Sequence, residues 1–201
     1  MNNETIICLN SKELPGIAPV GGKGYSLIKL SSLDLNVPPG IVLTINFFKE
    51  WIKEIQKSDL YIKFLELLNK DKKTNDCSSI LNQIKEWCIQ NLKLNEENKN
   101  NIEKYIKNIF QIDYNKILYT VRSSSPEEDL SGASFAGNYE TYLGIQYDSL
   151  EKYILKSFIS SLDFRVFKYK IENNFNVSKI KIVIAIMKQV NCDISGFGFS
   201  L

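Results

Sequence analysis

Short apolar runs alternate along the chain with segments of helical periodicity. Four runs have the length and the β-branched or aromatic content of strands: 41–43, 117–121, 139–143 and 180–187. Between 58 and 115, apolar residues recur every three or four positions, which predicts two or three helices. This mixture of strands and helices is typical of an α/β or α+β fold.

Two capping residues mark further helices. Thr44 precedes apolar positions at helical spacing as far as Lys57, and we expect a capped helix there. Asp148 precedes a longer pattern of the same kind, and we expect a single helix from it to about Glu172. The inward-facing positions expected in the first of these helices are Phe47, Phe48, Trp51, Ile52 and Ile55.

A glycine turn opens another apolar helix pattern near the N-terminus. Residues 21–24 read Gly-Gly-Lys-Gly, and Pro38 breaks the pattern that follows because proline cannot occupy a helix interior. We expect the glycine turn to begin a helix, one face of which is buried. Four apolar residues share that face: Leu27, Ile28, Leu30 and Leu33.

Within the single unit 1–201, the chain has three segments that differ in composition. Residues 1–57 hold the glycine–lysine turn and the first helices, and 58–115 form a helical segment without glycine or proline. Residues 116–201 form a sheet region rich in glycine, serine and β-branched residues. The last residues, 196–201, read as the beginning of a strand, from which we expect a truncated chain.

Composition and charge narrow the class of protein. The chain has 25 Lys and Arg against 23 Asp and Glu, a formal net charge of +2. This balance argues against nucleic acid as a partner, because nucleic-acid proteins usually have a strong basic excess. No signal peptide and no apolar run of about 18 residues is present, so we expect a cytoplasmic protein that does not span a membrane.

The histidine and cysteine counts exclude several chemistries. The chain has no histidine, which rules out a Ser-His-Asp triad, an imidazole-based zinc site and a phosphohistidine within these residues. Its four cysteines are far apart in sequence and form no Cys-x-x-Cys pair. We expect reduced thiols, as in cytosolic proteins.

Residues 121–137 are the segment richest in candidate chemistry. Arg122 ends a predicted strand, three serines follow it, and 132–137 form a loop of small residues between two glycines. Consecutive backbone amides in such a loop bind anions, and the planar fork of Arg122 adds two donors for a phosphate. The alternative interpretation is a surface hairpin with an arginine at its base.

Two weaker candidates stand beside this segment. Lys23 lies in a glycine turn at a helix start, where the helix dipole favours anions, although the spacing is not that of a Walker A loop. A plain loop is the alternative there. The acidic run 127–129 suggests a metal site, but a solvated turn after Pro126 explains it as well. Glu140 is a further carboxylate near the glycine loop.

Taken in order, these motifs resemble a known family. They are Gly-Gly-Lys-Gly-Tyr-Ser-Leu (21–27), Val-Pro-Pro-Gly (37–40), Val-Arg-Ser-Ser-Ser-Pro-Glu-Glu-Asp-Leu (121–130), Gly-Ala-Ser-Phe-Ala-Gly (132–137) and Asp-Ile-Ser-Gly (193–196). The chain is similar to the N-terminal ATP-binding domain of the phosphoenolpyruvate synthase and pyruvate phosphate dikinase family. Its glycine loop is closer to that of the synthases and the rifampicin phosphotransferases than to that of the dikinases.

The resemblance implies an ATP-grasp-like fold with a helical insertion, in which ATP lies between two lobes. It implies that Lys23 and Arg122 contact the ATP phosphates. It also implies that a loop closes over those phosphates through its backbone, with contacts from Gly132, Ala133, Ser134, Ala136 and Gly137. The adenine is expected against Met187, Gln189 and Val190. The family usually has glutamine at the position of Met187, and this departure leaves backbone hydrogen bonding to adenine available there.

The resemblance also implies a reaction and partners. In the complete enzymes ATP phosphorylates a histidine on a swivelling domain, which passes the phosphoryl group to pyruvate or, in the rifampicin enzymes, to the antibiotic. The Mg²⁺ ligands, the second ATP lobe and the phosphohistidine domain are expected beyond residue 201. Residues 1–201 alone are therefore expected to contain no catalytic residue or metal ligand and to be inactive. A non-catalytic nucleotide-binding or interaction module is the alternative.

Overall fold

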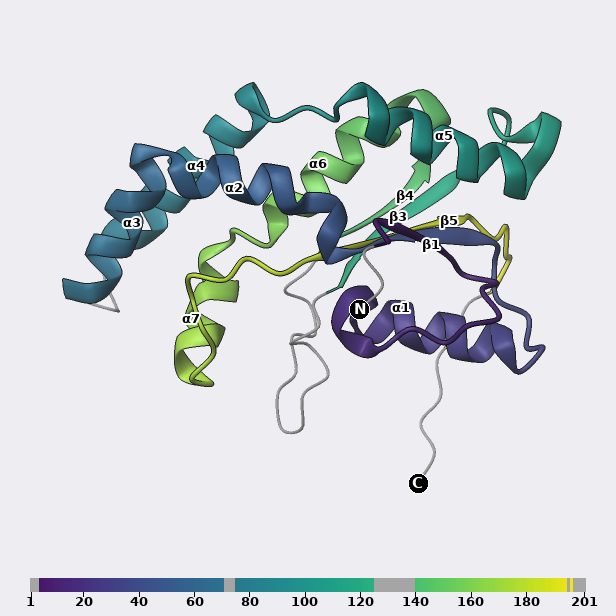
Figure 1. Ribbon diagram of the computed structural model, residues 1–201, viewed down its shortest axis with the longest axis horizontal. Coiled ribbons are helices and arrows are strands. Elements are labelled where there is room, and N and C mark those ends of the chain that lie inside the picture. The colour runs from purple at the N-terminus through teal and green to yellow at the C-terminus, as the bar shows by residue number, and fades with distance from the viewer. Residues whose placement is uncertain (1–3, 71–74, 125–139, 195, 197–201) are drawn as a thin grey trace.

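A five-stranded antiparallel sheet forms the centre of the computed structural model, which describes residues 4–70, 75–124, 140–194 and 196 (Figure 1). The strand order is β1-β2-β5-β3-β4, so the strand latest in sequence lies in the middle. The strands are β1 (Ile6–Cys8), β2 (Gly40–Leu43), β3 (Tyr119–Ser124), β4 (Thr141–Ile145) and β5 (Val183–Lys188). The fold is therefore a mixture of helices and an antiparallel sheet, as the sequence predicts.

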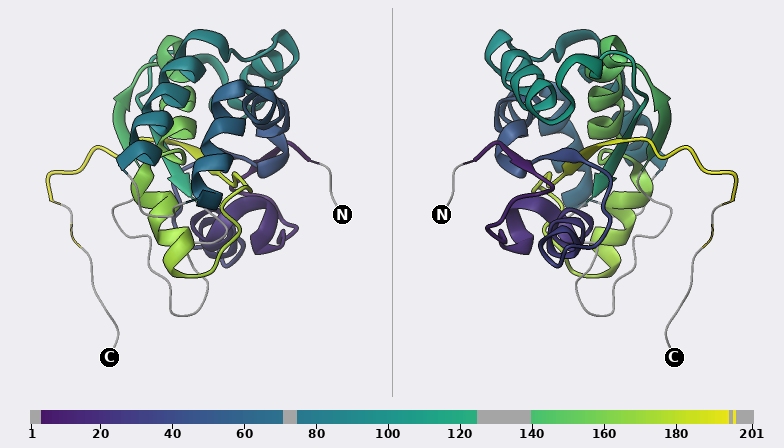
Figure 2. Two further views of the ribbon diagram at one scale, coloured as in Figure 1. Left: turned by 90° about the vertical axis from the view of Figure 1, so that its left-hand side faces the viewer. Right: turned by 90° about the vertical axis from the view of Figure 1, so that its right-hand side faces the viewer.

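The helices divide unequally between the two faces of the sheet (Figures 1 and 2). Helix α1 (Ile17–Ser32) packs on one face, and α5 (Glu96–Phe110) and α6 (Leu150–Ser160) pack on the other. The remaining helices extend this second layer: α2 (Lys49–Lys57), α3 (Asp59–Lys70), α4 (Asn75–Asn91) and α7 (Phe164–Glu172). Short 3₁₀ turns occur at Ile45–Phe48, Gln111–Asp113 and Tyr147–Ser149.

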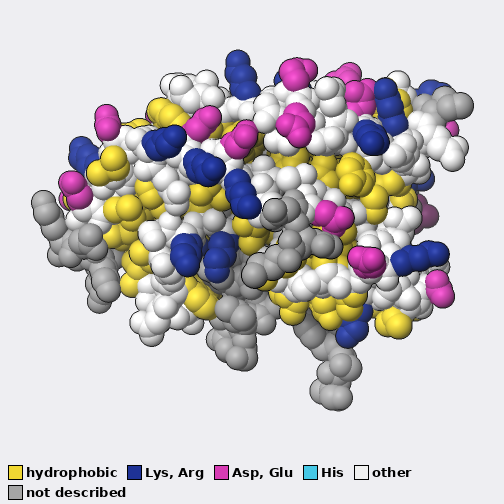
Figure 3. Space-filling view, viewed as in Figure 1, with side chains coloured by type: hydrophobic (Ala, Val, Ile, Leu, Met, Phe, Trp, Pro, Cys, Tyr) yellow, Lys and Arg dark blue, Asp and Glu magenta, His cyan; other side chains and the backbone are white. Residues whose placement is uncertain are grey.

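The middle of the chain is helical, as expected, since α3, α4 and α5 all lie within 58–115. Figure 3 shows both signs of charge interspersed over the side that carries α2 and α5, in keeping with the net charge of +2. Within the ranges that the structure describes, no helix combines the length and the apolar content required to cross a bilayer.

Alternation along β5 separates two cores. Ile184 and Ile186 face the larger core beneath α5 and α6, whereas Ala185 and Met187 face a smaller core beneath α1. Because this central strand is covered on both faces, it is apolar at nearly every position, which explains its unbroken hydrophobic run. Large aromatic side chains dominate the larger core: the Phe158 ring centroid lies 5.2 Å from that of Phe48 and 5.1 Å from that of Trp51.

The predicted inward face of the first helix is wrong in part. Ile28 is buried, but Leu30 and Leu33 are 42% and 62% exposed. The helix instead turns Val20, Gly24 and Ile28 toward the sheet, at a spacing of four residues. Gly24 lies against the sheet here, since a Cβ added to it would lie 3.5 Å from the Val42 side chain, an ordinary van der Waals contact.

The single helix predicted over 148–172 is two helices. Helix α6 ends at Ser160, and α7 begins after Asp163, whose carboxylate accepts a hydrogen bond from the Arg165 amide at 3.0 Å. The same carboxylate pairs with Lys85 of α4 at 3.0 Å. The periodicity of the apolar residues continues across this break, so the pattern alone does not reveal it.

Thr44 also has a different role from the predicted one. It stands at the start of the Ile45–Phe48 turn, but its hydroxyl makes no capping bond there and donates to the carbonyl of Glu4 at 2.8 Å. The α-helix begins only at Lys49 and ends at Lys57, the predicted end. Thr44 therefore ties the N-terminal residues to the end of β2.

The buried thiol of Cys88 makes the free energy of unfolding depend on pH in the alkaline range. Burial raises its pKa to about 12 from an ordinary value of 9.0. The unfolded chain releases this proton near pH 9, while the folded chain keeps it, so the free energy of unfolding decreases as the pH rises above 9. We expect a loss of roughly 1 kcal/mol between pH 9 and 10 in chemical denaturation. The Cys88→Ala variant should show a smaller slope; an unchanged slope would contradict this assignment.

Candidate functional site

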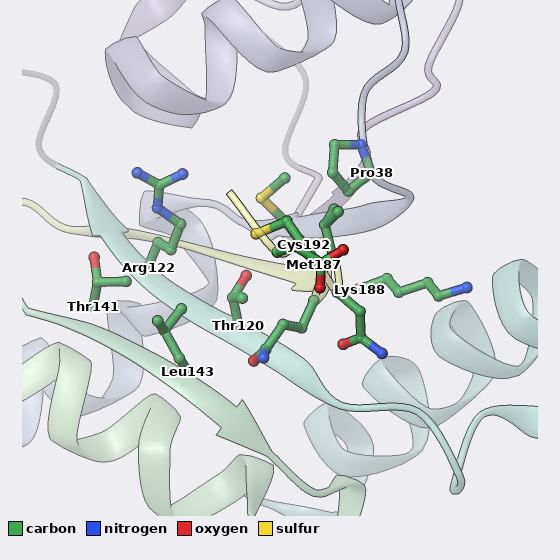
Figure 4. A pocket seen from close by; sticks show the side chains of 12 residues that line it. Pro38, Thr120, Arg122, Thr141, Leu143, Met187, Lys188 and Cys192 are labelled. Atoms are coloured by element: carbon green, nitrogen blue, oxygen red, sulfur yellow. The ribbon is translucent and has the colours of Figure 1, made fainter. Parts of the chain in front are cut away.

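A cavity of about 920 Å³ opens on the α1 side of the sheet (Figure 4). This volume is within the usual range for small-molecule sites. Its lining comes from the segment before β2, from β3 and β4, and from the end of β5 with the residues after it. The lining residues are Pro38, Thr120, Arg122, Thr141, Leu143, Met187, Lys188, Gln189, Val190, Asn191, Cys192 and Asp193.

Strand alternation explains why these side chains meet. In β3, Val121 belongs to the larger core, so Thr120 and Arg122 project to the opposite face. The register places Thr120 opposite Met187 of β5 and Arg122 opposite Thr141 of β4. Figure 4 shows Thr120, Arg122, Thr141 and Leu143 rising from the two strands on the same side. Arg122 is exposed, so its guanidinium is available to a ligand.

One end of the cavity combines apolar side chains with the polar residues at the end of β5 and after it. Met187 forms its floor and is buried, while Leu143 and Val190 are 66% and 58% exposed. Pro38 adds a further apolar wall. Apolar side chains together with a few polar groups are the usual lining of small-molecule sites. Arg122 lies two residues along β3 from Thr120, about 7 Å farther on.

A kink in β4 shapes this end of the cavity. The pairing of β3 with β4 shifts between Tyr119 and Val121, and Gly144 has a φ of 70°. The Gly144 amide donates to the side-chain oxygen Oε1 of Gln189. Gln189 therefore joins the kink to the segment that follows β5. This contact fixes the orientation of its amide group, with the Nε2 donors directed away from Gly144.

Lys23 lies on α1, the helix that covers this same face of the sheet. It follows Gly21, whose φ of 67° and ψ of 168° interrupt α1, so a new helical segment begins there. Its neighbour Gly24 contacts Val42 of β2. Val42 pairs with Ala185, which in turn pairs with Arg122, so Val42 and Arg122 lie two strand spacings apart, about 10 Å.

The structure thus brings together most of the predicted site residues that it describes. Arg122, Met187, Gln189 and Val190 line one cavity. Lys23 lies on α1, over the same face, and does not line the cavity among the described residues. Five predicted residues lie outside the described residues: Gly132, Ala133, Ser134, Ala136 and Gly137.

Sequence reasoning named four of the twelve lining residues, and the eight that it missed include Thr120, Thr141 and Leu143. A two-residue period counted back from Arg122 would have found Thr120. Thr141 and Leu143 require the pairing of β3 with β4, which the sequence does not specify. Glu140 is exposed, and its carbonyl accepts hydrogen bonds from the Ser123 amide and hydroxyl.

The described residues do not make a metal site by themselves. No group of three or more His, Cys, Asp or Glu side chains lies together within the described ranges. Asp193 is a lone carboxylate at the cavity rim. A hard cation such as Mg²⁺ needs several oxygen ligands, so Asp193 alone does not hold one.

Comparison with known proteins identifies the domain type. The family described as pyruvate phosphate dikinase, AMP/ATP-binding domain, matches residues 17–201. A probable phosphoenolpyruvate synthase of Methanocaldococcus jannaschii is 31% identical over 185 residues, covering 90% of this chain and 15% of the relative. A phosphoenolpyruvate synthase of Escherichia coli is 26% identical over 201 residues, covering 96% and 25%.

A relative with another printed activity matches as well. The rifampicin phosphotransferase of Bacillus subtilis is 27% identical over 197 residues, covering 97% of this chain and 22% of the relative. The chain thus spans less than a third of the length of each of these proteins. Since the family profile covers all but the first 16 residues, this chain belongs to the pyruvate phosphate dikinase AMP/ATP-binding domain family.

Proposed function

We propose that the cavity beside α1 binds ATP, with the adenine beside Met187 and Leu143 and the phosphates over Arg122. The supporting observation is the gradient along one face of β3 and β5. Met187 and Leu143 offer apolar contact near Thr120, and the cation follows about 7 Å along the strand. A nucleotide has the same two parts, an aromatic base and an anionic tail.

The proposed role of each residue follows from its place. Arg122 donates in a planar fork to phosphate oxygens, and Lys23 adds a second positive charge from the start of the α1 segment. Met187, Gln189 and Val190 are proposed to line the adenine. The glycine loop 132–137, which lies outside the described residues, is proposed to cover the phosphates with its amides.

The proposed reaction is phosphoryl transfer from ATP to a histidine on a swivelling domain, and then to pyruvate. Since residues 1–201 contain no histidine, the acceptor must lie on another domain. The ATP-grasp-like second lobe and the Mg²⁺ ligands are also proposed to come from outside this segment. Mg²⁺ would neutralise the phosphate charge when bound. The part described here holds and orients the nucleotide.

Rifampicin is the alternative acceptor. The Bacillus subtilis relative is named for that activity, and its identity to this chain is close to that of the synthases. No residue of the cavity distinguishes the two acceptors, because both would receive the phosphoryl group on another domain. ATP-dependent phosphorylation of pyruvate, measured beside that of rifampicin with the full-length protein, decides between them.

The Lys23→Ala variant tests the site assignment. Removal of one charge beside the phosphates should raise the Kd for ATP about tenfold, the effect of one charge-assisted hydrogen bond. The affinity for adenosine should not change, because it lacks the phosphates. Fluorescence titration of the full-length protein with each ligand measures both. Lys29→Ala, at the other end of α1, is the matched control. Equal ATP affinity in the Lys23 variant and the parent would contradict the assignment.

A further inference from the structure

The hydroxyl of Ser124 is a buried polar group whose burial the contacts of the described residues do not explain. Ser124 is 1% exposed. Among the described residues, its Oγ has no hydrogen-bond partner. Burial of a hydroxyl without a hydrogen-bond partner destabilises the folded state. Its neighbour Ser123 is also buried, but the Ser123 hydroxyl donates to the Glu140 carbonyl at 2.9 Å.

Strand alternation places Ser124 on the face of the sheet that carries the cavity and α1. Thr120, Arg122 and Ser124 succeed one another at every second position of β3. Ser124 pairs with Val183, which belongs to the small core between the sheet and α1. The hydroxyl therefore lies in the layer that α1 covers, about 7 Å beyond Arg122 and about 14 Å beyond Thr120.

The beginning of an α1 segment faces this layer. Val20 belongs to the same small core as Val183, and the helix is interrupted at the next residue, Gly21. The segment from Gly22 to Ser32 is long enough to have an N-terminus of its own, where free amides and the helix dipole attract anions. Gly22 and Gly24 have no side chains, so these residues do not cover the amides with side chains of their own.

We propose that Ser124 is a ligand of the terminal phosphates of ATP and acts together with the start of the α1 segment at Gly22. This inference rests on the proposed nucleotide site and extends it. The base end of the cavity lies at Thr120 and the cation at Arg122, so the tail of the nucleotide runs along β3 toward Ser124. A serine hydroxyl donates one hydrogen bond, which a phosphate oxygen accepts.

The Ser124→Ala variant should bind ATP more weakly without a loss of stability. The Kd for ATP should rise about tenfold, since a hydrogen bond to a charged group is lost. The Kd for AMP should stay within twofold of the parent value, because AMP lacks the terminal phosphates. The melting temperature of the ligand-free protein should not fall, since Ser124→Ala removes an unpaired buried hydroxyl and with it the cost of burying that group.

Ser123→Ala is the matched control, because it removes the same group one residue away on the other face. It should lower the melting temperature of the free protein, as it breaks the bond to Glu140, and leave the Kd for ATP unchanged. Thermal melts and nucleotide titrations of the full-length protein give both quantities for both variants.

Distinct outcomes separate this inference from the site on which it rests. If the parent binds ATP and the Ser124→Ala variant binds it equally well, Ser124 is not a phosphate ligand and the nucleotide site stands. A fall in melting temperature as large as that of Ser123→Ala would show a structural partner for the hydroxyl and also overturn the inference. A parent that binds neither ATP nor AMP would overturn the proposed function itself.

Discussion

The Arg122→Ala variant should bind ATP about 100-fold more weakly than the parent protein. Arg122 is the guanidinium that lines the cavity, and its planar fork makes up to two charge-assisted bonds to phosphate. The loss of such bonds costs about 1.5–3 kcal/mol each, and 2.7 kcal/mol corresponds to about 100-fold in Kd. Isothermal titration of the full-length protein with ATP measures the change. Adenosine binding should remain, since the end that holds Met187 is intact.

Two variants make this result specific. Arg122→Lys keeps the charge but loses the fork, so its Kd should lie between those of the parent and the alanine variant. Arg165→Ala removes the second arginine of the chain, which lies at the start of α7 and pairs with Asp163 outside the cavity. It should not change the Kd. A loss of similar size in Arg165→Ala would point to a general effect of charge and not to a site at Arg122.

The Gly40→Ala variant should unfold at a lower denaturant concentration, with a loss of about 1–3 kcal/mol. An ideal Cβ at this position would lie 2.3 Å from the Ile186 carbonyl oxygen and 2.8 Å from the Met187 Cα. Both are backbone atoms of the central strand, so neither moves without disturbing the pairing of β2 with β5. Because Met187 forms the cavity floor, ATP binding should weaken as well. Urea unfolding at neutral pH measures the change in stability.

A glycine in open space provides the control for this prediction. Among the residues that the structure describes, none comes within 4 Å of a Cβ placed on Gly196, so Gly196→Ala should alter stability by no more than about 0.5 kcal/mol. Equal stability of the Gly40→Ala variant and the parent would mean that β2 and β5 are farther apart than described here. The adenine end of the cavity would then have a different shape.

The chemistry of the site was easier to predict than its walls. Arg122 could be named from its residue type and its place at the end of a predicted strand, whereas Met187 was named only through the family resemblance. Leu143 could not be named, because its exposure over the cavity depends on the kink at Gly144 and on the contact that Gln189 makes with it. Both are tertiary features without a local signal.

The helices show a similar division. The apolar spacing predicted two or three helices in the middle of the chain, where local periodicity decides the structure, and the described residues there form α3, α4 and α5. It failed between Ser160 and Asp163, where α6 ends and the Asp163 side chain caps α7 without interrupting the apolar pattern. The strand β1 also escaped notice, since three residues are too few for a period to appear.

The position of β5 in the sheet has a consequence for how the chain folds. It lies between β2 and β3, and its partner Val42 stands more than 140 positions earlier in the sequence. Until residues 183–188 leave the ribosome, the preceding strands form only two separate ribbons, and a two-stranded ribbon is marginal in water. Nucleation must therefore wait for contacts of high sequence separation, which slows the search for the native pairing. During synthesis the inner edges of β2 and β3 stay open to aggregation.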